Sequence, residues 1–465
     1  MTLKIPFLLL AVGCLAAQAQ FSPTTQPFVS VDAPVVALTH VRVIDGTGSA
    51  PVADQTVVIA GGKIQSIGGA VPDGARVMDL TGHTVIPGLI GMHQHLFYPS
   101  GGGVPIYNEH AFSFPRLYLA CGITTMRTAG SLEPYTDLNL KALIDAGRMP
   151  GPKMLVTGPY LEGAGAFTPQ MHELKDAEDA RRTVEYWVAE GVTSFKAYMH
   201  ITRAELAAAI KAAHEHGVKV TGHLCSIGFR EAAELGIDNL EHGLVVDTEF
   251  MAGKKPDQCP AQVQTLAAFR NLDVSGAAVQ DTIRELVRRG VAITSTLSVF
   301  EAISSDRPPL GQRVLDAMTH EAAVSYLSSR ARGATTERLG LLRKEMEFER
   351  AFVKAGGLLI AGADPTGNGG ALAGFGDQRN LELLVEAGFT PVEAIQIYTS
   401  NAARFLGDAG IGVIAAGKQA DLVVIHGDPS VTIEDVEKVT IVFKDGVGYD
   451  SAKLIESARG AVGLH

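Results

Sequence analysis

Two histidines separated by one residue follow an apolar segment in the first quarter of the chain. Residues 87–92 read Pro-Gly-Leu-Ile-Gly-Met and lead directly to His93 and His95. Side chains two positions apart on a β-strand face the same side, so we expect both imidazoles to point into one site. Neutral imidazoles bind Zn²⁺ and similar ions. A lone His-x-His pair also occurs in structural positions, so the metal hypothesis needs further ligands.

Lys196 lies in the apolar, strand-like segment 194–199. Because desolvating an ammonium group is costly, a lysine here either reaches solvent from the strand end or becomes neutral. Burial lowers the pKa of an amine, and a neutral amine reacts with carbon dioxide to form a carbamate. The carbamate is anionic and has two oxygens that can bridge two metal ions. We therefore interpret Lys196 as a carboxylated lysine.

Three further residues end short apolar segments: His223, His242 and Asp364. A single histidine at a strand end is commonly structural, and an aspartate there can cap the next helix. Their position after successive strand-like segments favours one shared site instead. We predict that two divalent metal ions, with Zn²⁺ as the expected ion, are held by His93, His95, Lys196, His223, His242 and Asp364.

Three other polar residues lie near the same predicted strand ends. His110 follows the glycine-rich residues 101–103 and is a candidate for contact with the substrate. Tyr198 shares the strand face of Lys196, where it either lines the pocket or packs in the core. Arg127 ends a predicted strand. Its side chain either forms a structural salt bridge or binds the substrate, and the sequence leaves both roles open.

The middle of the chain alternates between short apolar segments and helical patterns, such as residues 176–190, 203–216, 279–289 and 391–403. This alternation predicts an α/β fold with parallel strands, and eight such units are the number that closes a (β/α)₈ barrel. An open doubly wound sheet is the alternative. Residues 247–278 and 301–349 exceed what a crossover needs and are expected to be helical coverings of the barrel mouth. The predicted strands are residues 85–92, 124–127, 154–158, 194–199, 219–223, 239–242, 292–296 and 358–362.

Both ends of the chain are rich in β-like segments with glycine-containing turns. These segments predict a small β-sandwich domain assembled from the two ends. The expected organisation is a signal peptide over 1–19, a composite β-sandwich over 20–85 plus 408–465, and a hydrolase barrel over 86–407. The segments are residues 35–44, 56–67, 77–87, 420–425 and 439–443.

The composition is typical of a globular protein. Of 465 residues, 46% are hydrophobic and 19% charged, and the net charge is −11. No cluster of Lys and Arg of the kind that binds nucleic acid stands out. The expected partner is a small-molecule substrate, and a homo-oligomer is left open.

The N-terminus has the features of an export signal. Lys4 precedes the apolar residues 5–17, and Ala17-Gln18-Ala19 is a small-x-small cleavage site. We expect an exported, periplasmic or secreted protein without a membrane span after cleavage. An uncleaved anchor and a lipoprotein through Cys14 are the alternatives. Three cysteines remain after cleavage, and one disulfide is compatible with them, but the sequence does not choose among Cys121, Cys225 and Cys259.

Together these motifs resemble the amidohydrolase superfamily, and most closely its prolidase-like and imidazolonepropionase-like branch. The similarity includes the six candidate ligands and residues 87–90, 399–407 and 417–424. It implies that His93, His95 and Asp364 hold one metal, that His223 and His242 hold the other, and that carboxylated Lys196 contacts both. Residues 92–95, Met-His-Gln-His, depart from the commoner Asp-x-His-x-His form, which removes an acidic neighbour of the ligands.

The resemblance also implies an enzyme that hydrolyses the C–N bond of a small peptide, an N-acyl amino acid or a related amide. A metal-bridging hydroxide would attack the carbonyl, and Asp364 would be the catalytic acid and base. The alternatives are hydrolysis of a cyclic amide, or of a lactone or phosphoester, on the same metal centre. The alternative from a different functional class is a protein that binds metal but catalyses no reaction.

Overall fold

The computed structural model describes residues 21–100, 106–302, 304, 307–332, 340–366 and 371–463. The expected signal peptide, Cys14 and the glycine-rich residues 101–103 lie outside these ranges. Within the part of the chain that is described, no helix is both long and apolar enough to cross a membrane.

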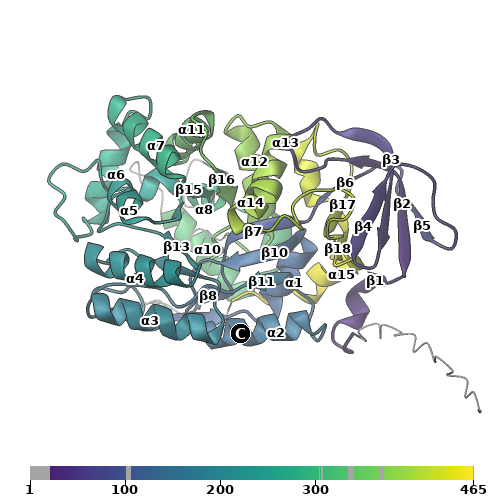
Figure 1. The fold of residues 1–465 in the computed structure, drawn as a ribbon, viewed down its shortest axis with the longest axis horizontal. Helices are drawn as coiled ribbons and strands as arrows, with labels where there is room; N and C mark the ends of the chain where they lie inside the picture. The colour runs from purple at the N-terminus through teal and green to yellow at the C-terminus, as the bar shows by residue number, and fades with distance from the viewer. Residues whose placement is uncertain are drawn as a thin grey trace, which may run out of the picture.

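Eight parallel strands among the described residues form the centre of the larger part of the molecule (Figure 1). They pair in the orders β7-β10-β11 and β12-β13-β14-β15-β16. Parallel bridges from Thr157 to Ser194 and from Leu161 to Ala197 link the segment after β11 to β12. Seven of the eight predicted strand regions each overlap one of these strands, and the first region contains β7 only in part. The strands are β7 Leu89–Gln94, β10 Ile123–Thr128, β11 Lys153–Leu155, β12 Ser194–Ala197, β13 Lys219–Gly222, β14 Asn239–Glu241, β15 Ala292–Ser295 and β16 Leu359–Ala361.

One contact brings the first and last of these strands together. The backbone N–H of Asp364, just after β16, donates to the carbonyl oxygen of His93 on β7 at 3.0 Å. A Cβ atom at Gly362 would lie only 2.3 Å from the backbone nitrogen of His93, so the close approach of the two strands requires glycine there. The two ends of the strand series therefore lie side by side.

Helices cover the outside of these strands, and buried apolar side chains fill the space between (Figure 1). Local signals set their ends: Asp176 caps α3 by accepting from the N–H of Asp179, and Thr202 and Glu205 form a capping box at α4. The covering helices are α1 Ser113–Ala120, α2 Pro134–Asp145, α3 Ala177–Glu190, α4 Arg203–Glu215, α5 Phe229–Leu235, α7 Ala277–Arg289, α11 Leu341–Lys354, α12 Phe375–Glu386, α13 Pro391–Gln396 and α14 Ala402–Leu406, the last two joined by the π-helical turn η4 Ile397–Asn401.

The prediction of one strand over residues 85–92 is wrong. The structure has two strands there, β6 His83–Pro87 and β7, which belong to different sheets. Gly88 separates them: its N–H donates to the carbonyl oxygen of Asp421, and a Cβ atom at this position would lie 2.1 Å from Oγ1 of Thr124. The backbone therefore passes from one sheet to the other at a point where no side chain fits.

Both ends of the chain contribute to one nine-stranded sheet, as predicted. Its order is β1-β19-β18-β17-β6-β2-β3-β4, with β5 paired to β2. Buried valines, isoleucines and leucines cover it. The structure joins these strands in a single sheet, and the two-layer packing of a sandwich stays a prediction. The remaining bounds are β1 Val29–Val31, β2 Val35–Val43, β3 Val52–Ala60, β4 Lys63–Ile67, β5 Arg76–Asp79, β17 Leu422–His426, β18 Val439–Lys444 and β19 Val447–Asp450.

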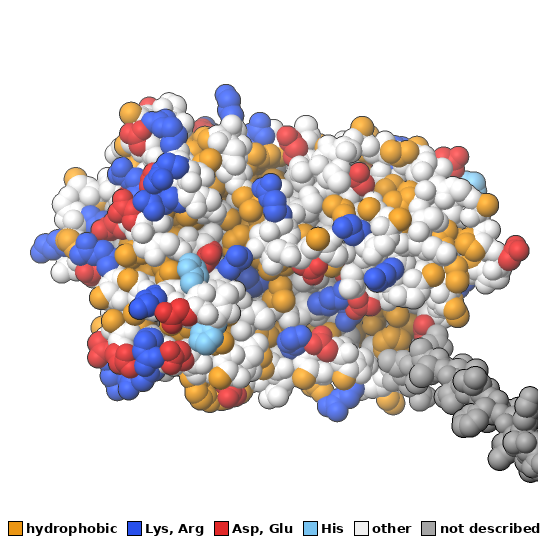
Figure 2. All heavy atoms as spheres, in the orientation of Figure 1, with side chains coloured by type: hydrophobic (Ala, Val, Ile, Leu, Met, Phe, Trp, Pro, Cys, Tyr) orange, Lys and Arg blue, Asp and Glu red, His pale blue; other side chains and the backbone are white. Residues whose placement is uncertain are grey.

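Additional elements decorate the strand and helix units. The two long stretches expected to be helical do contain helices, and a β-hairpin of β8 and β9 follows β7. On the face shown in Figure 2, Lys and Arg side chains are interspersed with Asp and Glu. The additional elements are β8 Phe97–Ser100, β9 Ile106–Glu109, α6 Gln262–Asn271, α8 Leu297–Ala302, α9 Gln312–Leu315, α10 His320–Arg332 and α15 Ser451–Ser457, with the short 3₁₀ turns η1 Gln26–Phe28, η2 Gly243–Val246 and η5 Ile433–Glu437.

Candidate metal centre

The six predicted ligands lie at or just beyond the C-terminal ends of their strands. His93 and Lys196 lie on β7 and β12, and the other four follow β7, β13, β14 and β16. Parallel strands place these ends on one side of the sheet, where barrel enzymes position their chemistry. Segments that are more than 100 residues apart therefore contribute to one place.

Asp364 is at the centre of the group. Its Oδ1 lies 3.4 Å from Nε2 of His93 and 3.2 Å from Nε2 of His95, and its Oδ2 lies 3.8 Å from Nδ1 of His242. Nζ of Lys196 lies 3.0 Å from Nε2 of His93. The ring of His223 packs on that of His242, with centroids 4.5 Å apart. The structure thus brings all six predicted residues together.

Two of these residues have backbone conformations that are uncommon for side chains other than glycine. His242 has φ 70° and Asp364 has φ 48°. Non-glycine residues in the left-handed region carry a conformational cost and are concentrated at functional sites. Local contacts hold both: Nδ1 of His242 lies 2.8 Å from Oγ1 of Thr296, and the N–H of Asp364 is bound by His93. The turn at each strand end directs the side chain back toward the other ligands.

Burial favours the neutral form of three imidazoles of the site, those of His95, His223 and His242. It lowers the pKa of His95 to about 4 and that of His223 to about 3, and it lowers the pKa of His242 well below its ordinary value. Burial also lowers the pKa of the Lys196 amine to about 8, against the opposing charges of Glu241 and Asp364. Neutral imidazoles and a lysine that is easily deprotonated are the forms that bind metal and react with carbon dioxide.

The buried residues Glu241 and Arg127 support the site from behind. Oε2 of Glu241 accepts a hydrogen bond from Nδ1 of His93 at 2.8 Å, and Oε1 accepts from Arg127 at 2.7 Å. Burial raises the pKa of the Glu241 carboxyl, but Arg127 and His93 outweigh this effect and hold that pKa well below its ordinary value. Arg127 also donates through Nε to the carbonyl of Met92 at 2.9 Å. Of its two open roles, the structure thus favours the structural salt bridge.

Sequence reasoning did not identify Glu241, although a signal was present. A carboxylate within the predicted strand 239–242, directly before a candidate ligand, is costly to bury unless it is paired. Glu241 also supplies an acidic neighbour of the ligands, which the departure from the Asp-x-His-x-His form was expected to remove.

The donor set fits divalent metal ions. One ligand atom each from His93, His242 and Asp364 lies within 4.8 Å of the others, and all three residues are buried. Neutral imidazole nitrogen together with carboxylate oxygen suits Zn²⁺ or a similar borderline ion. The three remaining candidates adjoin this group through the contacts given above.

The two candidate substrate residues have different surroundings. Nδ1 of His110 lies 2.9 Å from the carbonyl oxygen of Asn108, and its Nε2 accepts from the N–H of Gly463 at 2.8 Å. These contacts favour a structural role for His110, and its contact with a substrate stays a prediction. Tyr198 lies beside the ligands, with its ring centroid 4.9 Å from that of His223. Its position agrees with the pocket-lining alternative.

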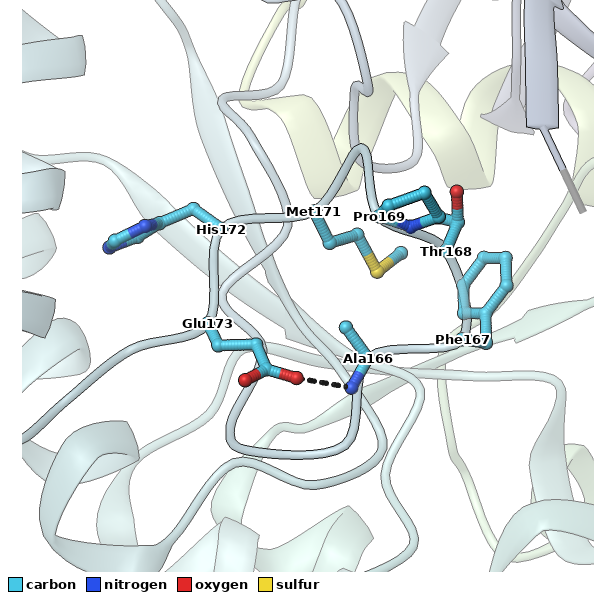
Figure 3. A pocket seen from close by; sticks show the side chains of 7 residues that line it. All are labelled: Ala166, Phe167, Thr168, Pro169, Met171, His172 and Glu173. Carbon is cyan, nitrogen blue, oxygen red and sulfur yellow. Dashed lines mark hydrogen bonds between the residues drawn. The ribbon is translucent and has the colours of Figure 1, made fainter. Parts of the chain in front are cut away.

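A hollow of about 530 Å³ lies nearby in the loop after β11 (Figure 3). Figure 3 shows the side chain of Glu173 bonded to the N–H of Ala166, which holds the loop closed. The adjacent Glu162 is fully buried and accepts from the N–H groups of Gly163 and His200. The residues that line the hollow are Ala166, Phe167, Thr168, Pro169, Met171, His172 and Glu173.

Comparisons with known proteins find a matching family and several similar proteins. The amidohydrolase family matches residues 84–448. A dihydroorotase of Lactobacillus leichmannii is 28% identical over 210 residues, which are 44% of this chain and 42% of the relative. A solved structure described as a "putative prolidase" from Bifidobacterium longum is 26% identical, with a TM-score of 0.66 over 93% of this chain and 100% of that one. A Xaa-Pro dipeptidase with bound methionine is 20% identical, with a TM-score of 0.68 over 90% of this chain and 100% of that one.

The chain belongs to the amidohydrolase family, because the match covers most of its length. Its strands, helices and the sheet from both ends correspond to the barrel with an extra domain that these neighbours imply. As a member of this family it is a hydrolase.

Proposed function

We propose that this protein is a binuclear metal-dependent amidohydrolase, and that its eight parallel strands form a closed (β/α)₈ barrel. Its substrate is the amide bond of a small peptide, an N-acyl amino acid or a related amide. The observation that carries the proposal is the meeting of His93, His95, Lys196, His223, His242 and Asp364 at the C-terminal strand ends, around the carboxylate of Asp364.

In this proposal His93, His95 and Asp364 would hold one ion, and His223 and His242 would hold the other. Lys196 would contact both once its amine has reacted with carbon dioxide and lost a proton. The pKa of this amine, about 8, leaves a useful fraction of the amine neutral near pH 7. Its side chain is 1% exposed, so the carbamate would form where little water competes.

Divalent ions at such a site lower the pKa of a water molecule and polarise a carbonyl group. The protein contributes the groups that move protons and fix geometry. Asp364 has its carboxylate near three imidazoles, so it can accept a proton from the attacking water and pass it to the departing nitrogen. Glu241 holds the His93 ring in one orientation, and Arg127 keeps Glu241 ionised.

The experiment is metal analysis combined with a hydrolysis screen. Purified protein is reconstituted with Zn²⁺ or Mn²⁺ and assayed against dipeptides, N-acyl amino acids, cyclic amides, lactones and phosphoesters. We expect about two ions per chain and turnover of linear amides. Turnover limited to cyclic amides, lactones or phosphoesters would select the alternative substrates. A protein that retains no metal and hydrolyses nothing would overturn the proposal.

We also propose that the protein is exported. The sequence of residues 1–19 supports this proposal, and so does the disulfide between Cys225 and Cys259, because structural disulfides persist in oxidising compartments. Cell fractionation, with N-terminal sequencing of the mature protein, tests it. A cytosolic protein that keeps Met1 would overturn it.

A further inference from the structure

Aromatic side chains form a closed circuit that begins and ends on a candidate ligand. From His95, ring centroids are 4.6 Å from Phe97, then 5.2 Å to Tyr107, 5.7 Å to Phe167 and 5.5 Å to Tyr198. We call this circuit the aromatic collar. It is completed by Tyr160, whose ring lies 4.9 Å from Tyr198 and 6.3 Å from His95.

The collar borders the candidate metal centre on more than one side. Tyr198 packs on His223, and Nζ of Lys196 lies 5.6 Å from the Tyr160 ring and 5.7 Å from the Tyr198 ring. The Tyr160 ring lies 6.3 Å from the ring of His95, whose Nε2 is 3.2 Å from Oδ1 of Asp364. A substrate amide that reaches Asp364 therefore has these rings as neighbours.

The collar contains three tyrosine hydroxyl groups whose hydrogen-bonding capacity is unused by the described residues. Over the described ranges of the chain, the hydroxyls of Tyr107, Tyr160 and Tyr198 form no hydrogen bond to another protein group. These three hydroxyl oxygens are not among the fully buried polar atoms that lack a partner, so they border open space and are available to water or to a ligand. None of the five phenylalanine and tyrosine side chains carries a charge at neutral pH, and the collar offers no ion pair to a charged substrate group.

Hydrogen bonds and packing restrain the conformation of the collar. The side chain of Gln170 accepts from the N–H of Tyr107 at 2.7 Å and donates to its carbonyl oxygen at 2.9 Å, as a neighbouring strand would. Gln170 belongs to the same loop as Phe167 and Met171, which line the hollow in Figure 3 and pack in one cluster with Tyr107. The hollow is thus continuous with the collar through shared side chains.

We propose that the aromatic collar is the specificity site of this enzyme, and that it binds an uncharged aromatic or bulky aliphatic group carried beside the scissile amide. This inference rests on the proposed amide hydrolysis and adds the substrate class to it. Flat rings bind other flat or branched apolar groups through buried area and offset or edge contacts. A charged group would lose its hydration and gain no partner there.

Two series of amides test the proposal with metal-reconstituted protein. One varies the acyl group on glycine among acetyl, phenylacetyl and succinyl, and the other varies the amino acid of N-acetyl substrates among Gly, Phe and Asp. In at least one series we expect kcat/KM for the aromatic member to exceed that of the small member by about 10- to 100-fold, with the charged member lowest.

Phe167→Ala is the variant of choice, because Phe167 is only partly buried and its removal leaves the cluster beneath in place. It should reduce the aromatic preference by about 10-fold or more, mainly through KM, as expected for uniform binding. Phe112→Ala is the matched control, since Phe112 is 54% exposed and lies outside the collar. The control should keep the preference of the wild type.

The outcomes separate the two proposals. Hydrolysis without an aromatic preference, or a preference that Phe167→Ala does not change, overturns the collar and leaves amide hydrolysis standing. If no amide is hydrolysed, the proposed function fails, and calorimetric titration with phenylacetate, acetate and succinate decides the collar alone. Tighter binding of phenylacetate, lost in Phe167→Ala, supports the collar, and equal or undetectable binding of the three overturns it.

Discussion

Nδ1 of His93 donates to Oε2 of Glu241 at 2.8 Å, and both side chains are completely buried. This contact assigns the proton of the His93 ring to Nδ1 and leaves Nε2 to face Asp364 and Lys196. We predict that Glu241→Gln lowers metal affinity by about 10- to 100-fold, the range found when an outer partner of a ligating histidine is changed. Titration of the metal-free protein with Zn²⁺ measures the effect.

A second variant separates this role from plain stability. Glu241→Gln also leaves the guanidinium of Arg127 buried without its carboxylate, which costs about 3–5 kcal/mol for a buried pair. Adding Arg127→Met removes that unpaired charge and should recover part of the thermal stability, but not the metal affinity. If the double variant regained normal metal affinity, Glu241 would not be positioning His93.

Lys196→Ala is expected to abolish metal binding and activity, because it removes the group proposed to contact both ions. Short carboxylic acids such as formate or propionate should restore part of the activity by taking the place of the carbamate oxygens. Metal content and turnover are measured with and without added acid. Near-normal turnover in the absence of any addition would contradict the bridging role.

Asp364→Asn is expected to retain at least one metal ion and to lower kcat by roughly 100-fold or more, as is typical for the loss of a general acid and base. The amide oxygen can still lie near His93 and His95, but the side chain can no longer accept a proton. Metal analysis and steady-state kinetics on the same preparation show both effects. An unchanged kcat would remove Asp364 from the catalytic role.

The sequence was informative where chemistry and periodicity coincide. The predicted ligands could be identified because each is a polar side chain within or just after a strand-like segment, and seven of the eight strands were recognisable by their alternation with helical patterns. The pattern of apolar residues alone could not show that Gly88 divides one apolar segment between two sheets. That division depends on the contacts that Gly88 makes with Thr124 and Asp421.

Other features depend on contacts between segments distant along the chain, and no local pattern indicates them. The pairing of Glu241 with His93 joins residues 148 positions apart. The aromatic collar draws Phe97 and Tyr107 from the β8–β9 hairpin and Phe167 from the loop after β11, and no local pattern shows that these two segments meet. His110 was a reasonable candidate for the mouth, but its bond to Gly463 near the C-terminus could not be foreseen.

Two buried carboxyls on α11 should contribute a stability to the fold that decreases as pH rises from about 4.5 to 8. Burial raises the pKa of Glu345 on α11 to about 8, against the hydrogen bonds that it accepts from the N–H groups of Val245 and Leu244. Burial and the charge of Glu345 likewise raise the pKa of Glu349 well above its ordinary value. Between these pH values the folded protein holds protons that the unfolded chain releases, so the free energy of unfolding falls with pH.

Thermal melting of the metal-free protein from pH 5 to pH 8 measures this dependence, with an upper limit of about 1.4 kcal/mol per pH unit for each group. Glu345→Gln, which is neutral at every pH, should flatten the profile. Glu234→Gln, on the exposed surface of α5, is the control and should leave the profile as it is. A profile that Glu345→Gln does not alter would contradict the assignment.

The disulfide between Cys225 and Cys259 ties the segment after β13 to the segment before α6, 34 residues further along the chain. Cys225 comes two residues after His223, so the crosslink restrains the chain beside a candidate ligand. Closing a loop of this length stabilises a fold by roughly 3–4 kcal/mol in the chain-entropy account. We predict that Cys259→Ser lowers the melting midpoint by several degrees, and that a reductant lowers the wild type to the same value while leaving the variant unchanged.

Peptide analysis tests the crosslink directly. Digestion without reduction, followed by mass spectrometry, should recover a peptide pair that links Cys225 to Cys259. The remaining described cysteine, Cys121, is buried, and burial raises the pKa of its thiol to about 12, so it should stay reduced and unreactive in the folded protein. If the linked peptides are absent from protein made in an oxidising compartment, or if the reductant does not change the midpoint of the wild type, the crosslink does not stabilise this fold, and the support that it gives to export is lost.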